Sequence, residues 1–434
     1  MNILAINPWI YDFAAYDLWA KPLGFLYILE FLKSKGFKII FLDCLDRYHP
    51  LLKYVENYKI KENEFGCGKF FWEQIPKPEV FSFVPRRYKR YGLPITIVKQ
   101  FLQKVEKPDI IMITSSMTYW YLGIKDIITI LKEVFKNTPI VVGGTYPILC
   151  PQHSQRILES TFIINQYVPY KLKEVFESLF GIKLDFSEQT LFQHKPYYDA
   201  YQYLPYVVLR RSWGCPFECE FCGLKKMYKG FFEKDYRKVF KEIMYFYNKG
   251  VKNFVFYDDA LCFPPDSLKV LLKKIVHHKL RIKIHTPNGL HALFIDKELA
   301  FLFKESGFVM PRISFESSQP QIIEKFSYKV DKEILKKAIY NLRKAGYKEG
   351  EYGVYIIFAA PDQDLEILKK DILFCHHLGC RIFLADFSYV SEKDTCIKEP
   401  LLHNNSIFPA VDKRLWSYLQ DIKNWTTQLN KKLA

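Results

Sequence analysis

Residues 213–223 read WGCPFECEFCG, and this stretch decides the fold of the chain. Its three cysteines, Cys215, Cys219 and Cys222, follow the spacing C-x3-C-x2-C directly after a predicted strand. Thiolates hold iron–sulfur clusters, and three thiolates within eight residues can reach three irons of one cubane. No fourth cysteine lies close by, so one iron of such a cluster could bind a small molecule. The alternatives are buried structural thiols or a zinc site, which usually needs a fourth Cys or His ligand.

The chain around this motif alternates predicted strands with predicted helices. Strands are expected at 206–209, 253–257, 281–285, 312–315, 354–358 and 381–385. The clearest helices are expected at 236–248, 267–278, 297–306 and 332–345. This alternation indicates a parallel sheet, and six βα units are two fewer than a full (β/α)8 barrel. A partial (β/α)6 barrel is therefore predicted over 206–400, followed by a helical tail over 401–434 with one amphipathic helix near 411–429.

The first 180 residues show the same alternation on a smaller scale. Strands are expected at 2–6, 38–42, 109–114, 139–142 and 161–165, and helices at 23–35, 124–135 and 171–180. The pattern predicts an α/β, doubly wound, Rossmann-like sheet, whose ligands sit at the carboxyl ends of the strands. Residues 181–205 are turn-rich and polar and are predicted to be a linker.

The cysteine motif resembles the signature of the radical S-adenosylmethionine (SAM) superfamily, in which aromatic residues often stand where Phe217 and Phe221 do. The resemblance implies a [4Fe–4S] cluster on Cys215, Cys219 and Cys222. Its open iron would chelate the amino and carboxylate groups of SAM. One electron would then cleave SAM to methionine and a 5′-deoxyadenosyl radical, which abstracts hydrogen from the substrate.

Three later segments are similar to the family's SAM-binding segments at the ends of the second, fourth and fifth strands. They read FYDDA (256–260), ISFES (313–317) and IIFAAP (356–361). The resemblance implies cofactor contacts from Phe217, Phe221, Asp258, Asp259, Glu316, Ser317 and Pro361. Taken alone, an acidic residue after a strand is often a helix cap. The sequence departs from the family by placing Ala359-Ala360 before Pro361, where glycine is frequent.

Residues 1–180 resemble the cobalamin-binding domain that precedes the radical core in one large branch of the superfamily. The resemblance is carried by DLWAKPLG (17–24), PDIIMITSS (108–116) and PIVVGGTY (139–146). It implies that cobalamin is bound by Leu23, Gly24, Ser115, Ser116, Thr118, Gly143, Gly144 and Thr145. No D-x-H-x-x-G segment supplies a histidine beneath cobalt, and this branch commonly lacks one. The alternative is a cofactor-free α/β domain that presents the substrate.

Two further features of this region have two interpretations each. The segment MTYWY (117–121) follows a strand end, so its aromatics face the cofactor edge or belong to the core. Cys44, Cys67 and Cys150 could hold a second iron–sulfur cluster, as in methylthiotransferases, or be buried thiols. The remaining cysteines are interpreted as structural: Cys262, Cys375, Cys380 and Cys396.

The composition limits the setting of the protein. The formal net charge is +16, yet no Lys/Arg run is as dense as a nucleic-acid tail, so the charge is interpreted as spread over solvated faces. The ten cysteines do not form a secreted disulfide framework, and no apolar run of about 18 residues appears. The first residues lack the features of a signal peptide. A soluble, reducing, cytoplasmic setting is therefore predicted.

The function implied by the resemblance is a cobalamin-dependent radical SAM enzyme, most often a C-methyltransferase acting on an unactivated carbon. Two alternatives remain: radical chemistry without methyl transfer, such as rearrangement or sulfur insertion, and modification of RNA or a carrier protein with the N-terminal domain as recognition module. A small molecule or peptide is favoured over RNA as the substrate. A low-potential electron donor such as flavodoxin or ferredoxin is the expected partner.

Overall fold

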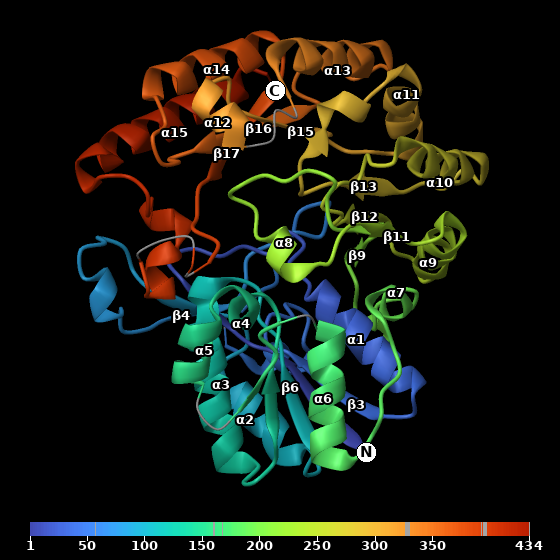
Figure 1. Cartoon of the computed structure of the whole chain (residues 1–434), viewed down its shortest axis with the longest axis vertical. Coiled ribbons are helices and arrows are strands. Elements are labelled where there is room, and N and C mark those ends of the chain that lie inside the picture. The colour runs from blue at the N-terminus through green and yellow to red at the C-terminus, as the bar shows by residue number, and fades with distance from the viewer. Residues whose placement is uncertain are drawn as a thin grey trace. The chain divides into compact units, whose positions relative to one another are not determined.

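The structure is a computed structural model of the chain (Figure 1). It describes residues 1–434 apart from 57, 159–160, 167, 326–329, 392, 394–396 and 434, and apart from the side chain of residue 188. Cys396, interpreted above as structural, lies outside the described residues. The chain divides into two compact units. Unit 1 comprises Met1–Pro205 and Val390–Ile407, and unit 2 comprises Tyr206–Tyr389 and Phe408–Ala434.

Unit 1 is built around a five-stranded parallel sheet with the order β3-β1-β6-β7-β8. Its strands are β1 (Asn2–Asn7), β3 (Lys38–Asp43), β6 (Ile110–Ile113), β7 (Ile140–Val142) and β8 (Phe162–Ile163). The order of the strands reverses between β1 and β6, as in doubly wound folds. All four residues of β6 are buried, which is typical of a parallel strand covered on both faces. The parallel α/β sheet predicted for this region is confirmed.

Helices connect these strands. The longer ones are α1 (Leu23–Ser34), α2 (Ile95–Lys104), α3 (Tyr121–Val134) and α6 (Val168–Phe180). Helix α1 forms because Leu26, Leu29 and Leu32 repeat at helical spacing, and all three are fully buried. The chain leaves this helix at Gly36, whose φ of 87° is readily adopted only by glycine.

A second, antiparallel sheet in unit 1 was not predicted from the sequence. Its strands β2 (Ile10–Asp12), β4 (Trp72–Gln74) and β5 (Lys89–Tyr91) lie in the order β2-β5-β4. Each strand has only three residues, which is too short for a period of two to be recognised. The sheet gains a further bond between its strands, because the Tyr88 hydroxyl directly before β5 donates to the Tyr11 carbonyl of β2 at 3.1 Å.

The segment 181–205, predicted to be a linker, packs into unit 1. It contains α7 (Glu188–Leu191) and a 3-10 turn at Tyr198–Ala200. The buried Tyr201 hydroxyl donates to Asp43 Oδ2 at 2.6 Å, at the end of β3. Phe186 packs on Phe31 of α1 with 4.5 Å between ring centroids. Aromatic burial therefore gives this polar-looking stretch a fixed place.

Unit 2 contains all six strands predicted for it, and every pairing among them is parallel. Together with β14, which was not predicted, they form two sheets, with orders β13-β12-β9 and β14-β15-β16-β17. The strands are β9 (Val207–Leu209), β12 (Asn253–Phe256), β13 (Lys283–His285), β14 (Leu290–His291), β15 (Arg312–Glu316), β16 (Gly353–Phe358) and β17 (Arg381–Asp386). A parallel bridge between Ile284 and Phe308 lies next to β13. Closure of the two sheets into a partial barrel remains a prediction.

The helices of unit 2 often begin where an aspartate caps them. They are α9 (Tyr236–Asn248), α10 (Pro265–His277), α11 (Lys297–Ser306), α13 (Lys332–Lys344), α14 (Leu365–His377) and α15 (Trp416–Lys431). Asp235, Asp296, Asp331 and Asp364 each accept a hydrogen bond from a backbone amide in the first turn of the helix that follows. These caps explain why the boundaries of α9, α11 and α13 lie so close to the predicted ones.

Helix α15 packs beside the sheet formed by β14 to β17. The Asn430 side chain accepts from the Ile382 amide and donates to the Ile382 carbonyl, both at 2.8 Å. These two bonds satisfy backbone groups of the edge strand β17 that would otherwise stay open. Over the described residues, no helix combines the length and the apolar content needed to cross a bilayer.

Candidate active site

The cysteine loop is closed at its base by a short antiparallel ribbon. Strand β10 (Ser212–Trp213) pairs with β11 (Phe232–Glu233), and Trp213 stacks on Phe232 with 5.4 Å between centroids. Gly214 leaves the ribbon with φ 77°, and a Cβ there would lie 2.1 Å from the Gly230 carbonyl oxygen. Only glycine fits this crossing of two backbone segments. The loop between them therefore has a fixed start and a fixed end.

The three cysteines lie in this loop, before α8 (Leu224–Met227). Cys219 is buried, and Cys215 and Cys222 are half-buried. The Cys222 amide donates to the Cys219 carbonyl at 3.2 Å, so the last two cysteines share one tight turn.

Aromatic residues between the cysteines anchor the loop to the rest of unit 2. Phe217 stacks on His291 at 4.8 Å between centroids, and Phe221 packs edge-on against Phe387 at 5.2 Å. The Glu220 amide also donates to the Lys325 carbonyl at 2.8 Å. The structure gives both predicted aromatic positions a packing role.

The donor set matches what an iron–sulfur cubane needs from the protein. In a cubane each cysteine thiolate binds a different iron. The three thiols of one loop provide three separate ligands, and the next cysteine in sequence, Cys262, is fully buried after β12. The residues present therefore suit a cluster with one open iron.

Asp258 follows β12 and holds the strand that leads into the loop. Its carboxylate accepts from the Ser212 amide and the Ser212 hydroxyl, both at 2.7 Å, and from the Arg211 amide at 3.2 Å. Burial raises the pKa of Asp258, and the charge of Arg211 and the Ser212 hydrogen bond oppose that rise. These contacts give the side chain a role other than the helix cap considered from the sequence.

Asp259, the next residue, holds the first turn of the loop. Its two carboxylate oxygens accept from the Arg210 guanidinium at 2.8 and 3.2 Å, and Oδ2 also accepts from the Gly214 amide at 3.2 Å. Burial raises the pKa of Asp259, and Arg210 opposes the rise. Both predicted aspartates thus already have protein donors, and their contact with SAM stays a prediction.

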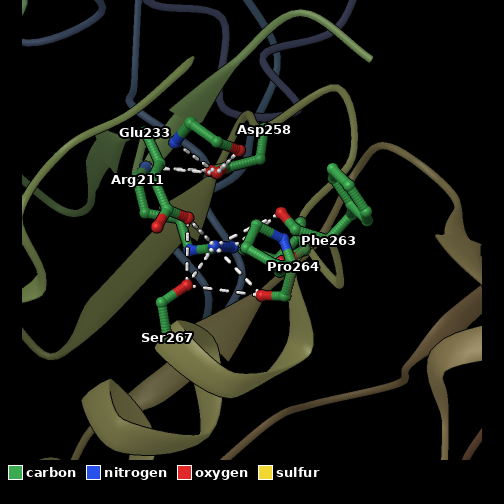
Figure 2. Close-up of polar contacts among 8 residues, drawn as sticks. Arg211, Glu233, Asp258, Phe263, Pro264 and Ser267 are labelled. Carbon is green, nitrogen blue, oxygen red and sulfur yellow. Dashed lines mark hydrogen bonds and ion pairs between the residues drawn. The ribbon is translucent and has the colours of Figure 1, made fainter. Parts of the chain in front are cut away.

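Arg211, which no sequence pattern singled out, joins three segments around this site (Figure 2). Its guanidinium donates to Glu233 Oε2 at 2.8 Å, to Ser267 Oγ at 2.7 Å and to the Leu261 carbonyl at 2.9 Å. It also donates to the carbonyls of Phe263 and Pro264 (Figure 2). The signal available in the sequence was its position directly before the motif. Its role follows only from hydrogen bonds to residues that lie 22 to 56 positions away in the sequence.

The ends of β15 and β16 both carry residues in the left-handed region. Glu316 has φ 68° at a register shift in β15, and Ala359 has φ 59° directly after β16. Such conformations cost about 1–3 kcal/mol and concentrate at functional sites. Glycine would adopt the φ of Ala359 without strain. The half-buried Pro361 follows in the same turn.

Ser317 is buried below this edge and takes part in a hydrogen-bond network. Its hydroxyl donates to Asp371 of α14 at 3.4 Å and accepts from the Gln319 amide at 3.1 Å. The Gln319 side chain donates to the Asp362 carbonyl at 2.9 Å, which links the ends of β15 and β16. The structure therefore gives Ser317 a supporting position below the turn that carries Glu316.

In unit 1, Ser115 joins the ends of β6 and β7. Its hydroxyl donates to the Gly143 carbonyl at 2.9 Å and accepts from the Tyr146 amide at 3.0 Å. Its carbonyl accepts from the Thr145 amide at 3.1 Å. Gly144 has φ 95°, and a Cβ there would lie 2.4 Å from the Ser115 carbonyl oxygen. The predicted residues at these two strand ends thus form one bonded edge.

The other predicted cobalamin residues lie in the loops and helix starts that follow the strands. Gly24, in the first turn of α1, is exposed, and a Cβ there would meet no atom within 4 Å, whereas Leu23 is buried. Ser116 is exposed, and Thr118 is buried in the 3-10 turn Thr118–Trp120. A small crevice of about 10 Å³, room for about one water molecule, lies where the strand order reverses. It is lined by Asn7, Pro8, Trp9, Ile10, Leu45, Ser115, Ser116, Met117, Trp120 and Ile124. Such reversal points are where doubly wound sheets bind ligands.

Cys44, Cys67 and Cys150 are all buried. Burial, with the charge of Asp43 adding to it, raises the pKa of the Cys44 thiol well above its usual value. A neutral, buried thiol is typical of a structural cysteine.

The sequence and the fold of the chain both have known relatives. Residues 211–375 match the family model described as the radical SAM superfamily. No curated protein matches the chain. The fold is similar to that of the radical S-adenosylmethionine methyltransferase TsrM from Kitasatospora setae, solved with tryptophan substrate and a SAM analog, with a TM-score of 0.63 and 13% identity over 88% of this chain and 72% of that one.

A second similar structure is the cobalamin-dependent S-adenosylmethionine radical enzyme OxsB with aqua-cobalamin and SAM bound. Its TM-score is 0.59 at 15% identity, over 94% of this chain and 56% of that one. Another TsrM structure, with cobalamin and a [4Fe–4S] cluster bound, matches with a TM-score of 0.62. Residues 211–375 thus match the radical SAM superfamily, and the fold of the chain is similar to that of cobalamin-dependent radical SAM enzymes.

Proposed function

We propose that the chain is a cobalamin-dependent radical SAM enzyme that transfers a methyl group to an unactivated carbon. The observation that carries the proposal is the cysteine loop. Its three thiols, with no fourth cysteine close by in the sequence, lie in a loop fixed to β9 and β12 by Arg210, Asp258 and Asp259. When bound, the cluster, SAM and cobalamin would supply the electron, the radical and the methyl group.

The residues of unit 2 would hold these groups and keep them oriented. Cys215, Cys219 and Cys222 would hold the cluster, and the half-buried Glu316 would face SAM from the end of β15. The strained turns at Glu316 and Ala359 keep two strand ends in a set conformation before SAM arrives. Phe217 and Phe221 would keep the loop in place because both rings pack on neighbours.

Unit 1 would hold cobalamin at the edge formed by β6 and β7. Gly24 leaves open space for a large ligand, and Ser116 is exposed. The Ser115 bonds keep the Gly143–Tyr146 turn in place, so that its backbone can approach the ligand closely. The fold shared with TsrM and OxsB supports this assignment.

Metal analysis tests the proposal. The protein is purified anaerobically from cobalamin-fed cells, and iron and cobalt are counted per chain for the wild type, Cys219→Ala and Cys380→Ala. We expect about four Fe and about one Co in the wild type. Cys219→Ala should lose iron and keep cobalt, and Cys380→Ala, at a buried position before β17, should keep both.

Other iron and cobalt contents per chain would change the proposal in defined ways. About four Fe without Co would leave a radical SAM enzyme whose unit 1 presents the substrate. About eight Fe would indicate a second cluster on Cys44, Cys67 and Cys150. A wild type without iron under reducing conditions would overturn the proposal.

A further inference from the structure

One segment of unit 1 comes from a distant part of the chain. Residues 390–407 belong to unit 1, although the chain before and after them belongs to unit 2. We call its continuously described part, residues 397–407, the strap. The strap contains the 3-10 turns Pro400–His403 and Asn405–Ile407, and its Leu401, His403 and Asn404 are buried. It therefore packs as part of the core of unit 1.

The first polar contact of the strap is buried and directional. Asn404 Nδ2 donates to Asp12 Oδ1 at 2.9 Å, and both residues are at most 4% exposed. Asp12 Oδ2 accepts from the indole Nε1 of Trp120 at 2.8 Å, and Oδ1 also accepts from the Phe13 amide at 2.7 Å. Asp12 thus links Asn404 of the strap to Trp120.

The second contact holds the neighbouring residue, Tyr121. Glu399 Oε1 accepts from the Tyr121 hydroxyl at 3.0 Å, and Glu399 Oε2 lies 3.8 Å from His153 Nε2. His153 Nδ1 is 2.7 Å from the Tyr146 hydroxyl, and the ring of Tyr146 stacks on Tyr121. The strap therefore holds two neighbouring aromatic residues. Asn404 holds Trp120 through Asp12, and Glu399 holds Tyr121 directly.

These two aromatic residues stand at the carboxyl edge of the sheet. They join the 3-10 turn after β6 to the first residue of α3. Trp120, with Ser115, Ser116 and Met117, lines the crevice between the ends of β1 and β6. The wall of the crevice is consequently fixed from far along the chain, since Glu399 is 278 residues from Tyr121 and Asn404 is 392 residues from Asp12.

We propose that the strap is a positioning element of the ligand site in unit 1, and that Asn404 acts through Asp12 to set the Trp120 side of the crevice. The inference rests on the proposed cobalamin site at this edge. A strap that served only to fill space would need no buried amide on a buried carboxylate, because burying such groups is costly unless each is hydrogen-bonded. A wall that is already in place lowers the ordering cost when the ligand binds.

The test compares Asn404→Ala with Asn405→Ala in the full chain. Asn405 is the matched control, because it is a neighbouring Asn of the strap whose contact with the Tyr119 hydroxyl is 3.5 Å long. Hydrogen exchange of residues 117–121 is measured in cofactor-free protein, and binding of hydroxocobalamin is measured by equilibrium dialysis. Asn404→Ala should speed hydrogen exchange at residues 117–121 about tenfold and weaken the binding of hydroxocobalamin about tenfold. Both are the changes expected when one hydrogen bond to a charged group is lost. Asn405→Ala should stay within about twofold, because a contact of 3.5 Å is at the limit of a hydrogen bond.

A double-mutant cycle with Trp120→Phe, which removes the indole donor and keeps a ring, checks that Asn404 acts through Trp120. We expect the two losses in affinity to be non-additive. Additive losses, or unchanged exchange at 117–121 in Asn404→Ala, would overturn the role of the strap. If Asn404→Ala does not fold, Asn404→Ser, which is too short to reach Asp12, takes its place. If the wild type does not bind hydroxocobalamin, the proposed function is refuted instead. The hydrogen-exchange data then still show whether the strap positions residues 117–121.

Discussion

The pair formed by Arg210 and Asp259 offers the sharpest test of how the cysteine loop is held. The guanidinium donates two hydrogen bonds to the carboxylate, at 2.8 and 3.2 Å, and the same carboxylate accepts from the Gly214 amide. The side chains of Arg210 and Asp259 are 14% and 7% exposed. Replacing Asp259 with Asn removes the charge and turns one acceptor into a donor that faces the guanidinium. The first turn of the loop should then loosen.

The expected size of the effect follows from burial. Breaking a buried ion pair by removing one partner lowers the free energy of unfolding by about 3–5 kcal/mol. Because Arg210 is partly exposed, we expect the cost of Asp259→Asn to lie at the lower end, at about 3 kcal/mol. Arg210→Gln should cost less, about 1–3 kcal/mol, because the pKa of Asp259 is already raised by burial and the carboxylate can take up a proton. The double variant should cost less than the sum of the two, with a coupling of about 1.5–3 kcal/mol.

Urea unfolding of the four cofactor-free proteins at pH 7, under anaerobic conditions, measures the coupling, and iron per chain after reconstitution measures the loop. Asp259→Asn should lower both stability and iron content. Glu218→Gln is the control, because its pair with Lys225 lies in the same loop but is largely exposed. The anchoring role of the pair would be refuted if the stability costs of the two single variants added up to that of the double variant within about 0.5 kcal/mol, and if Asp259→Asn also kept its full iron content.

Three further predictions concern stability. Burial lowers the pKa of His285 to about 3, so between pH 6.5 and that pKa only the unfolded chain takes up the proton. The free energy of unfolding should therefore fall by up to about 1.4 kcal/mol for each pH unit in this range. Replacement of His285 with Gln should flatten this slope in urea unfolding between pH 7 and 5, and an unchanged slope would contradict the assignment. Ala359→Gly should leave the melting temperature unchanged or higher, because it relieves φ 59°, whereas Ala360→Gly should destabilise by about 0.5–1 kcal/mol. Gly144→Ala should destabilise by about 2 kcal/mol or more in thermal unfolding, because its Cβ would lie 2.4 Å from a backbone oxygen, and Gly24→Ala should not destabilise.

The elements that could be predicted from the sequence are those whose signals are local. β6 and β12 were recognisable because parallel strands buried on both faces are short runs of apolar residues. α9 and α11 were recognisable because an aspartate caps each helix start. The cysteine spacing was local too, and it led to the superfamily whose family model matches residues 211–375.

The remainder depends on contacts between distant residues. The three-residue strands β2, β4 and β5 exist only because they pair with one another, so no periodicity predicts them. The acidic residues Asp258 and Asp259 were noticed for a contact with SAM, but the donors that hold them come from the end of β9 and the ribbon after it. The bond between Asp12 and Asn404 spans 392 residues, and no pattern in the sequence relates the two.

The discontinuity of unit 1 has a consequence for how this protein can be divided or inherited. A gene fragment that ends at Pro205 would encode the whole five-stranded sheet but not residues 390–407, and Asp12 would lose the amide donor of Asn404 while staying in the core. The complementary fragment would carry the same residues as a loop without the surface on which they pack. The two units therefore cannot be exchanged between relatives as linear cassettes. A working graft of unit 1 has to carry its return segment with it, so the two pieces of unit 1 have to be transferred together.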